Sequence, residues 1–335
     1  MSNNSKVLST ARTDKKDEFY TRYEDIELEI NEYLKFNPNV FRDKIVMCPC
    51  DNPEWSNFPK YFVTNFDRLG LKKLICTCYI EDISDGLFSL SEEKDKTKNG
   101  RIFIMDKNHK YINPDKIPFN YLETDGGFAN MEITKLRNES DIIVTNPPFS
   151  LFRKFIKWCQ PEKRSILLIG NMNACSCKDV FKLFMDDKIW LGMTGFNTGM
   201  YFNVPDDYKY KSSYTYHKEI DGKKVMRVPG VCWFTNIEHS QRYKDIKLVD
   251  KDILEYKKYD RYDALDIPNI NMIPDNYNGK MGVPITFLNR YNPKQFEILG
   301  MDMYMEDNVI YGKRFSKDGV KTYARIIIKR KINTV

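Results

Sequence analysis

Short, wholly apolar runs alternate with amphipathic segments along the chain up to about residue 240. The apolar runs are typical of buried strands and cover residues 44–48, 73–79, 101–105, 141–145, 165–170, 188–191 and 231–236. Apolar residues at helical spacing mark residues 23–36, 133–138, 151–159 and 180–185, and a further helical stretch ends at residue 69. Strands that alternate with helices form parallel sheets covered on both faces. The pattern therefore predicts an α/β fold with a mainly parallel sheet.

The pattern changes after residue 192. Residues 193–230 are rich in Gly, Asn, Tyr and Lys and have little helical periodicity, and from residue 251 Tyr, Asn, Asp and Pro dominate. In this last part, short strands are expected near residues 283–288 and 324–329. We predict a flexible polar arm over residues 1–16, an α/β domain over 17–240 with an insertion at 193–230, and a smaller, irregular, tyrosine-rich module over 241–335.

The composition is that of a globular protein with a basic C-terminal end. Hydrophobic residues make up 41% of the chain, enough for a sizeable core. No apolar run approaches the ~20 residues of a spanning helix, and the polar N-terminus has no signal core, so we expect a cytoplasmic protein without a membrane partner. The net charge is +6, and residues 311–335 hold eight basic residues and one acidic residue. This end suits a polyanion, the alternative being a solvated basic tail.

The cysteines do not require a metal. Six of the eight form Cys-x-Cys pairs, at positions 48/50, 76/78 and 175/177, in or near apolar runs. Alternate residues of a strand share a face, and reduced cysteine behaves as a small hydrophobe. We therefore expect buried, reduced cysteines and no bound metal. A zinc site is the alternative, which the short spacing disfavours because structural zinc usually separates its cysteines by at least two residues.

The sequence Asn146-Pro147-Pro148-Phe149 follows the buried strand at residues 141–145. Asn146 thus lies at the carboxyl end of a strand, where open α/β sheets bind ligands. The prolines remove two backbone donors, so Asn146 Oδ1 and the Pro147 carbonyl can accept both hydrogens of an aromatic amino group while Phe149 stacks on its ring. Such bonding localises the lone pair on nitrogen and makes it nucleophilic. The alternative is an ordinary Asn-Pro-Pro turn.

This tetrad resembles the motif of amino-methyltransferases that use S-adenosylmethionine (SAM). The wider sequence resembles the EcoRI-like DNA adenine methyltransferases, through residues 17–21, 50–58, 69–75, 146–153, 169–174, 188–192, 232–236 and 281–287. The resemblance implies a Rossmann-like, SAM-dependent methyltransferase domain over residues 17–240 and a target-recognition module with a basic tail over 241–335. The implied reaction is methyl transfer to the 6-amino group of an adenine flipped out of duplex DNA. A type II restriction–modification setting follows, with an endonuclease for the same, GAATTC-type site.

The resemblance also implies a SAM site at the carboxyl ends of the first strands. Its candidate residues are Phe19, Tyr20 and Thr21 near the methionine part, Asp51 for the α-amino group, Ser56, Asn57 and Phe58 for the carboxylate, Glu81 for the ribose, and Asp125 with Phe128 for the adenine. The sequence departs from the general pattern twice: no Gly-x-Gly follows the first strand, and Gly127 replaces a usual carboxylate. Core aromatics at residues 19–21 and a plain Asp-Gly-Gly turn at 125–127 are the alternatives.

Sequence recognition would need base contacts from outside the catalytic sheet. The candidates are residues 193–230 and 251–335, with the basic tail on phosphates through Lys313, Arg314, Lys321, Arg325, Lys329 and Arg330. We expect a monomer bound to double-stranded DNA. Two alternatives keep the chemistry but change the substrate to adenine in RNA or to a glutamine amide in a protein, although the glutamine enzymes usually carry Tyr at the position of Phe149. A third is a non-enzymatic DNA-binding protein with a degenerate methyltransferase fold.

Overall fold

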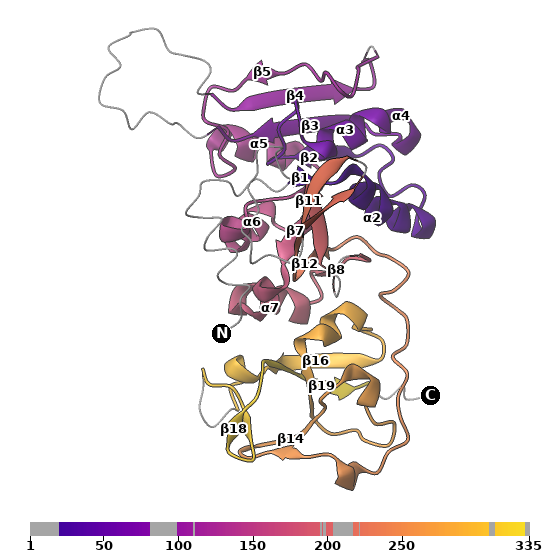
Figure 1. The fold of residues 1–335 in the computed structure, drawn as a ribbon, viewed down its shortest axis with the longest axis vertical. Coiled ribbons are helices and arrows are strands. Elements are labelled where there is room, and N and C mark those ends of the chain that lie inside the picture. Colours follow the sequence, from indigo (N-terminus) through magenta and orange to yellow (C-terminus); the bar gives the residue numbers. More distant parts are fainter. Residues whose placement is uncertain are drawn as a thin grey trace, which may run out of the picture. The chain divides into compact units, whose positions relative to one another are not determined.

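The computed structural model describes residues 20–80, 99–109, 111–194, 196, 199–203, 217–220, 222–307 and 312–331. The chain divides into two compact units (Figure 1). Unit 1 comprises residues 1–171 and 193–237, and unit 2 comprises residues 172–192 and 238–335. The arm expected over residues 1–16 lies outside the described residues. Compact units do not show what each part of the chain does. The division into a methyltransferase domain and a target-recognition module therefore stays a prediction.

The main sheet of unit 1 has a parallel centre and antiparallel edges (Figure 1). Its strands are β2 (Ile45–Cys48), β3 (Lys73–Cys78), β4 (Arg101–Asp106), β5 (Asn120–Tyr121), β6 (Ile142–Thr145), β7 (Ser165–Asn171) and β12 (Val231–Thr235), in the order β5-β4-β3-β2-β6-β7-β12. The pairs β3–β2, β2–β6 and β6–β7 are parallel, whereas β4 and β12 run antiparallel to their neighbours. The α/β fold class is confirmed, and the edges correct the expectation of a mainly parallel sheet.

Helices cover both faces of this sheet. They are α2 (Tyr23–Phe36), α3 (Asn57–Thr64), α4 (Phe66–Leu69), α5 (Met131–Glu139), the 3₁₀ turn η2 (Phe149–Leu151) and α6 (Phe152–Cys159). Val46 and Leu74 face a core shared with α2 and α3, while Met47 and Ile75 face Ile133 of α5. This alternation follows from strand geometry, which turns successive side chains to opposite faces. The helical stretch expected to end at residue 69 is interrupted at Asn65, whose Nδ2 donates to the Tyr61 carbonyl at 2.9 Å.

The insertion contains strands that its sequence did not indicate. β9 (Met200–Asn203) and β11 (Lys223–Val228) form an antiparallel sheet with β1 (Tyr20–Thr21) and β10 (His217–Ile220), in the order β1-β9-β11-β10. The start of the insertion is fixed by Glu29, a fully buried residue of α2. Its carboxylate accepts from the backbone N–H groups of Met193 and Thr194, each at 2.8 Å, and from the Tyr33 hydroxyl at 2.6 Å. Burial raises the pKa of Glu29, and these donors oppose the rise.

Unit 2 is built around a sheet of its own (Figure 1). Its strands, in sheet order, are β13 (Lys258–Tyr259), β14 (Tyr262–Asp266), β15 (Met281–Pro284), β19 (Arg325–Arg330) and β16 (Phe296–Met301). The unit also holds η3 (Met172–Ser176), α7 (Lys178–Met185), β8 (Trp190–Leu191), η4 (Ile253–Glu255), η5 (Ile270–Met272), η6 (Ile285–Arg290), η7 (Asp302–Tyr304) and the hairpin β17 (Ser316–Lys317) with β18 (Val320–Lys321). The expected irregular module is therefore more regular than its sequence indicated. The strand expected near residues 283–288 ends at Pro284, and η6 follows.

The interior of unit 2 contains a compensated buried charge. Asp266 is 3% exposed and forms ion pairs with Lys317 and Arg325, and it also accepts from the Tyr259 hydroxyl at 2.9 Å. Burial alone would raise the pKa of Asp266, but these donors hold it below its usual value. In the part of the chain that the structure describes, no helix is both long and apolar enough to cross a membrane.

Candidate active site

The tetrad begins where β6 ends and leads directly into α6. Asn146 is partly exposed although its Oδ1 atom is buried, Pro147 is buried, and Pro148 is exposed. The Pro148 carbonyl accepts from the Leu151 N–H at 2.9 Å, which closes the turn η2. Of the two proline carbonyls, that of Pro147 thus stays the candidate acceptor for an amino group. Phe149 packs partly against the main core of unit 1 and is otherwise accessible, which suits a stacking platform.

The far end of this loop is locked onto the sheet by Phe152. Its side chain is 2% exposed, and its ring centroid lies 4.8 Å from that of Phe234 on β12. A Cβ atom at Gly170 of β7 would lie 2.4 Å from the Phe152 ring, so only glycine leaves room for it. The tetrad is therefore held between two fixed points, β6 before it and the first turn of α6 after it.

Asp51 is a buried carboxylate beside the tetrad. It follows β2 and is 4% exposed. Its Oδ1 accepts from Ser56 Oγ at 2.7 Å, and its Oδ2 accepts from Thr145 Oγ1 at 2.5 Å. Burial raises the pKa of Asp51 to about 7, because desolvation outweighs these two hydroxyl donors. No Lys or Arg of the described ranges forms an ion pair with it, so its negative charge lacks a partner.

Thr145 is a site residue that the sequence analysis missed. It is the last residue of β6 and directly precedes Asn146, and its hydroxyl joins the candidate cofactor carboxylate Asp51 to the candidate catalytic loop. Its partner is 94 positions away, so no local pattern could identify the contact. The only available signal was a small hydroxyl residue at the end of an otherwise aliphatic strand.

The loop after β2 is shaped without the usual glycines. The backbone carbonyl of Asn52 accepts from the Ser56 N–H at 2.9 Å, and its side-chain oxygen accepts from the Glu54 N–H at 3.0 Å. Arg101 of β4 pairs with Glu54, and its guanidinium lies 4.5 Å from the centroid of the Phe119 ring. Side-chain bonds therefore replace the conformational freedom of the absent Gly-x-Gly. Arg101 and Glu54 were also missed, again because the contact is distant in sequence.

The next helix and the N-terminal strand meet at Asn57. Ser56 caps α3 by accepting from the Phe58 N–H, and Asn57 Nδ2 donates to the Thr21 carbonyl at 2.8 Å. The Thr21 hydroxyl is buried and has no hydrogen-bond partner among the residues described. The Phe58 side chain is fully buried in the core, and a role of Phe58 at the cofactor's carboxylate stays a prediction. Tyr20 is described only through its backbone in β1, and Phe19 and Glu81 lie outside the described residues.

The Asp125–Phe128 loop lies at the end of β3. The Asp125 carbonyl accepts from the Ile80 N–H at 2.9 Å. The Asp125 carboxylate closes a turn by accepting from the Gly127 N–H at 2.9 Å and from Asn130 Nδ2 at 2.6 Å, which is the alternative role considered above. Asp125 is exposed, and a contact with the cofactor's adenine stays a prediction.

Phe128, in turn, packs against α6. Its ring centroid lies 5.1 Å from that of Phe155 and 5.6 Å from that of Trp158, both in edge-to-face geometry. Phe128 is only partly buried.

Substituting the two glycines of this loop should give opposite results. Gly126 has φ +79°, and a Cβ atom there would lie 2.2 Å from the Cys78 carbonyl oxygen, so Gly126→Ala should destabilise the protein by roughly 2 kcal/mol or more. Gly127 has an ordinary φ, and its nearest contact would be the Asp125 carboxylate at 3.2 Å, so Gly127→Ala should fold normally. Denaturant unfolding of both variants checks this. Equal stability of the two variants would contradict the close packing of Gly126 on β3.

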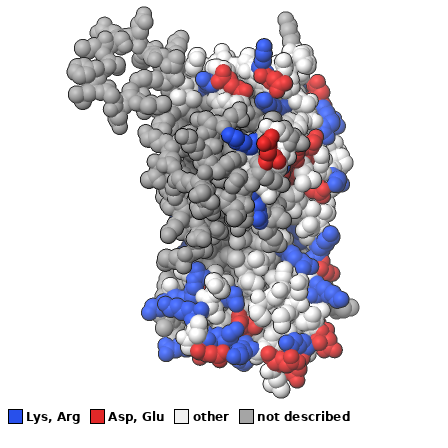
Figure 2. All heavy atoms as spheres, viewed as in Figure 1, with Lys and Arg blue, Asp and Glu red and all other residues white. Residues whose placement is uncertain are grey.

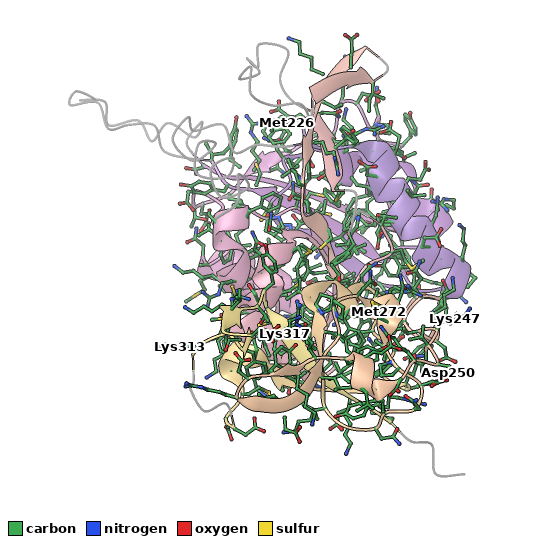
Figure 3. The ribbon with its side chains drawn as sticks, turned by 60° about the horizontal axis from the view of Figure 1, so that its bottom comes forward. Met226, Lys247, Asp250, Met272, Lys313 and Lys317 are labelled. Carbon is green, nitrogen blue, oxygen red and sulfur yellow. The ribbon has the colours of Figure 1, made fainter. Side chains whose placement is uncertain are left out.

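The basic residues expected to contact phosphates lie in different settings in unit 2. Lys313, Lys321 and Lys329 are exposed and Arg314 is partly exposed, and Figure 3 shows Lys313 at the outer edge of the unit. Figure 2 shows that the Lys and Arg side chains on this face of unit 2 alternate with Asp and Glu. The surface is thus mixed in charge rather than uniformly basic, and contacts of these four residues with DNA stay predictions.

Arg325 and Arg330 are already engaged within unit 2. The Arg325 side chain is 11% exposed, and its Nε donates to Asp266 Oδ1 at 3.0 Å. Arg325 therefore belongs to the interior of the unit rather than to an accessible tail, because its charge is compensated there. Arg330 Nη1 donates to the backbone carbonyl of Asp275.

The described residues contain no group of three or more His, Cys, Asp or Glu side chains placed to hold a metal. The cysteines are free thiols, and Cys48 and Cys76 are buried side by side in the pairing of β2 with β3. Burial raises the pKa of Cys48, which keeps its thiol protonated.

Almost the whole chain is similar to a known protein family. Residues 7–331 match the family described as adenine-specific methyltransferase EcoRI. Type II methyltransferase M.EcoRI of Escherichia coli is 41% identical over 333 residues, which cover 98% of this chain and 97% of that protein. Type II methyltransferase M.MpnI of Mycoplasma pneumoniae is 32% identical over 345 residues, covering 98% and 99%. No solved structure gives a significant match. The resemblance noted in the sequence is confirmed, and the chain belongs to the EcoRI family of adenine-specific methyltransferases.

Proposed function

We propose that the protein transfers a methyl group from SAM to the 6-amino group of an adenine flipped out of duplex DNA, with residues 146–149 as the catalytic loop. One observation carries this proposal above all. The partly exposed Asn146 lies next to Thr145, whose hydroxyl binds the buried and uncompensated carboxylate of Asp51. Thr145 thus connects Asp51, which suits the cationic cofactor, to Asn146, which suits the amino group of the target base.

The residues around Asp51 fit the cofactor. Each Asp51 oxygen accepts one hydroxyl and keeps a further lone pair, which suits the α-amino group of SAM. The buried Thr21 hydroxyl, without a partner in the described ranges, is a second polar group that a ligand would satisfy. When bound, SAM supplies an electrophilic methyl group on a positively charged sulfur. Asp51 would hold the amino group, and Thr21 together with the first turn of α3 would line the same end of the site.

The catalytic loop would activate the target nitrogen by accepting its two hydrogens. Asn146 Oδ1 takes one and the Pro147 carbonyl takes the other, which favours a pyramidal nitrogen with a localised lone pair. Phe149 stacks on the adenine ring and, with the two hydrogen bonds, offsets the few kcal/mol of unstacking that base flipping requires. No side chain needs to act as a base, because the amino proton becomes acidic only after alkylation and is then released to water.

The setting of the reaction is inferred from the family. Because two relatives are named type II methyltransferases, we infer a restriction–modification role here, with a cognate endonuclease that cuts the same site. A GAATTC-type site, a monomeric state and a cytoplasmic location stay predictions. The alternative substrates are adenine in RNA and a glutamine amide in a protein, and labelling with tritiated SAM distinguishes them from DNA.

Purified protein incubated with tritiated SAM should label duplex DNA, and mapping of modified bases in methylated plasmid should locate N6-methyladenine at one defined sequence. RNA and protein substrates should stay unlabelled. The aromatic platform beside two acceptors fits a planar heterocyclic amine rather than a glutamine amide. The relatives named type II methyltransferases favour DNA over RNA as the source of that amine. Labelling of RNA or protein without DNA would contradict the proposed substrate, and absence of SAM binding in calorimetry would contradict enzymatic function altogether.

A further inference from the structure

Unit 2 contains an open cavity of about 760 Å³ that is lined by polar side chains. It lies between the loop at residues 275–278, the loop at residues 292–295 and the end of β19. None of its lining residues belongs to the candidate active site of unit 1. Most of these residues fall in the range 251–335 expected to supply base contacts, and Arg330 is also one of the basic residues expected on phosphates.

The floor of the cavity is held by a network of hydrogen bonds. Asn292 is 1% exposed; its Nδ2 donates to Asp245 Oδ1 and its Oδ1 accepts from the Lys294 N–H, both at 2.9 Å. Gln295 binds the backbone of Ile246 with both ends of its amide, at 2.7 and 2.8 Å. The Lys331 N–H donates to the Gln295 carbonyl at 2.9 Å. These bonds fix the shape of the cavity before any ligand arrives.

The rim, in contrast, presents side chains that can make new contacts. Asn276 and Asn278 are exposed, and each offers an amide with both donors and an acceptor. The Lys294 ammonium lies 4.6 Å from the centroid of the Tyr243 ring, so a cation–π contact positions its charge at the cavity. Preorganised amides and a placed ammonium are suited to directional recognition.

The chemistry of the lining selects one ligand class. Small-molecule sites are mostly apolar, and this lining is not. A channel for phosphates would be uniformly basic, yet here the lining contains Asp245 and Asp275 as well as Lys294, Arg330 and Lys331. Mixed donors and acceptors match the edges of base pairs in the major groove, where Asn reads adenine and Lys reads guanine.

We propose that this cavity reads the base edges of the target duplex, with Asn276, Asn278 and Lys294 as the residues that determine sequence preference. The inference rests on the proposed function, since it names the part of the chain that recognises the DNA to be methylated. Arg330 takes part as a positioning residue, because its guanidinium binds the Asp275 carbonyl and so fixes the start of the loop that carries both asparagines.

The test compares methylation of the mapped recognition site with methylation of sites changed at one base pair. The variants are Asn276→Ala, Asn278→Ala and Lys294→Ala, and the control is Lys247→Ala, which removes the same charge from an exposed position of unit 2 outside the cavity (Figure 3). The ratio of kcat/KM between the recognition site and the changed sites should fall roughly tenfold in at least one cavity variant. The control should keep the wild-type ratio, and the thermal midpoint and SAM dissociation constant should stay unchanged in all of them.

Two results would overturn the inference. One is an unchanged ratio in every cavity variant; the other is an equal loss on all sequences with a weaker dependence on salt, which would identify phosphate contacts instead. Both are separable from failure of the proposed function, because they require a wild-type protein that methylates DNA. If the wild-type protein labels no DNA, the proposed function itself is wrong.

Discussion

Asn146→Ala is expected to lower kcat for methyl transfer by roughly 10²–10³-fold or more, since losing one preorganised hydrogen-bonding group of a reaction centre has effects of this size. The amide oxygen would no longer accept one of the two amino hydrogens, so the lone pair would stay delocalised into the adenine ring. SAM binding should be unaffected, because Asp51 and Thr145 keep their contact. Single-turnover labelling of duplex DNA gives the rate, and calorimetry gives the SAM dissociation constant.

A matched control separates chemistry from loop geometry. Pro148 is exposed, and its carbonyl is already bound by the Leu151 N–H, so Pro148→Ala should reduce the rate far less than Asn146→Ala. Asn146→Asp keeps an oxygen acceptor at the same position and should retain part of the activity. The role assigned to Asn146 would be wrong if Asn146→Ala methylated DNA at the wild-type rate, or if the alanine variant lost SAM binding as well.

Asp51 should make SAM binding depend on pH. Its pKa is raised to about 7 by burial, so the carboxyl group is largely neutral at pH 5.5 and ionised above pH 7. Binding of the cofactor's ammonium favours the ionised form, and the α-amino group itself stays protonated throughout this range. The SAM dissociation constant should therefore rise roughly tenfold between pH 7 and pH 5.5. Calorimetry at several pH values measures it.

The variant Asp51→Asn should bind SAM weakly and without this pH dependence. The free energy of unfolding provides an independent check. Raising the pH should strengthen SAM binding but weaken the contribution of Asp51 to the stability of the ligand-free protein. Because the folded-state pKa of Asp51 lies above the usual value of 3.8, its contribution to the stability of the ligand-free protein is full below that value and is lost as pH rises through about 7. Asp51→Asn should then gain stability relative to wild type from pH 5 to pH 8. Wild-type affinity that is flat with pH would refute the assignment.

The parallel centre of unit 1 could be predicted from the sequence, and so could the location of the tetrad at the end of β6. Buried parallel strands are nearly continuous apolar runs, so Ile45–Cys48 and Ile142–Thr145 could be recognised locally. Residues that follow neighbouring parallel strands meet at one edge of the sheet. The sequence placed Asp51 after one such strand and Asn146 after another, and the hydrogen bond from Thr145 to Asp51 joins the ends of these strands.

The parts of the fold and of the site that could not be predicted depend on contacts between segments that are distant in sequence. Met200–Asn203 pairs with Tyr20–Thr21 and with β11. Tyr201 and Phe202 favour a strand, but the segment is only four residues long and its partners are distant in sequence. Residues 285–290 have the apolar content of a strand but form η6 after Pro284, which lacks a backbone donor for further pairing. The engagement of Arg325 by Asp266 could not be foreseen either, because the partner lies 59 positions earlier.

The pairing of β1 with β9 has a consequence for the order in which the protein is made. Thr21 pairs with Phe202, so the N-terminal strand acquires its partner only after some 180 further residues have been synthesised. A nascent chain that has completed β2, β6 and the tetrad can form the bond from Asn57 to the Thr21 carbonyl, but it still lacks the strand that pairs with Thr21. The cofactor-binding end therefore matures late, and a prematurely terminated product that stops before residue 203 would carry the tetrad without a finished binding site.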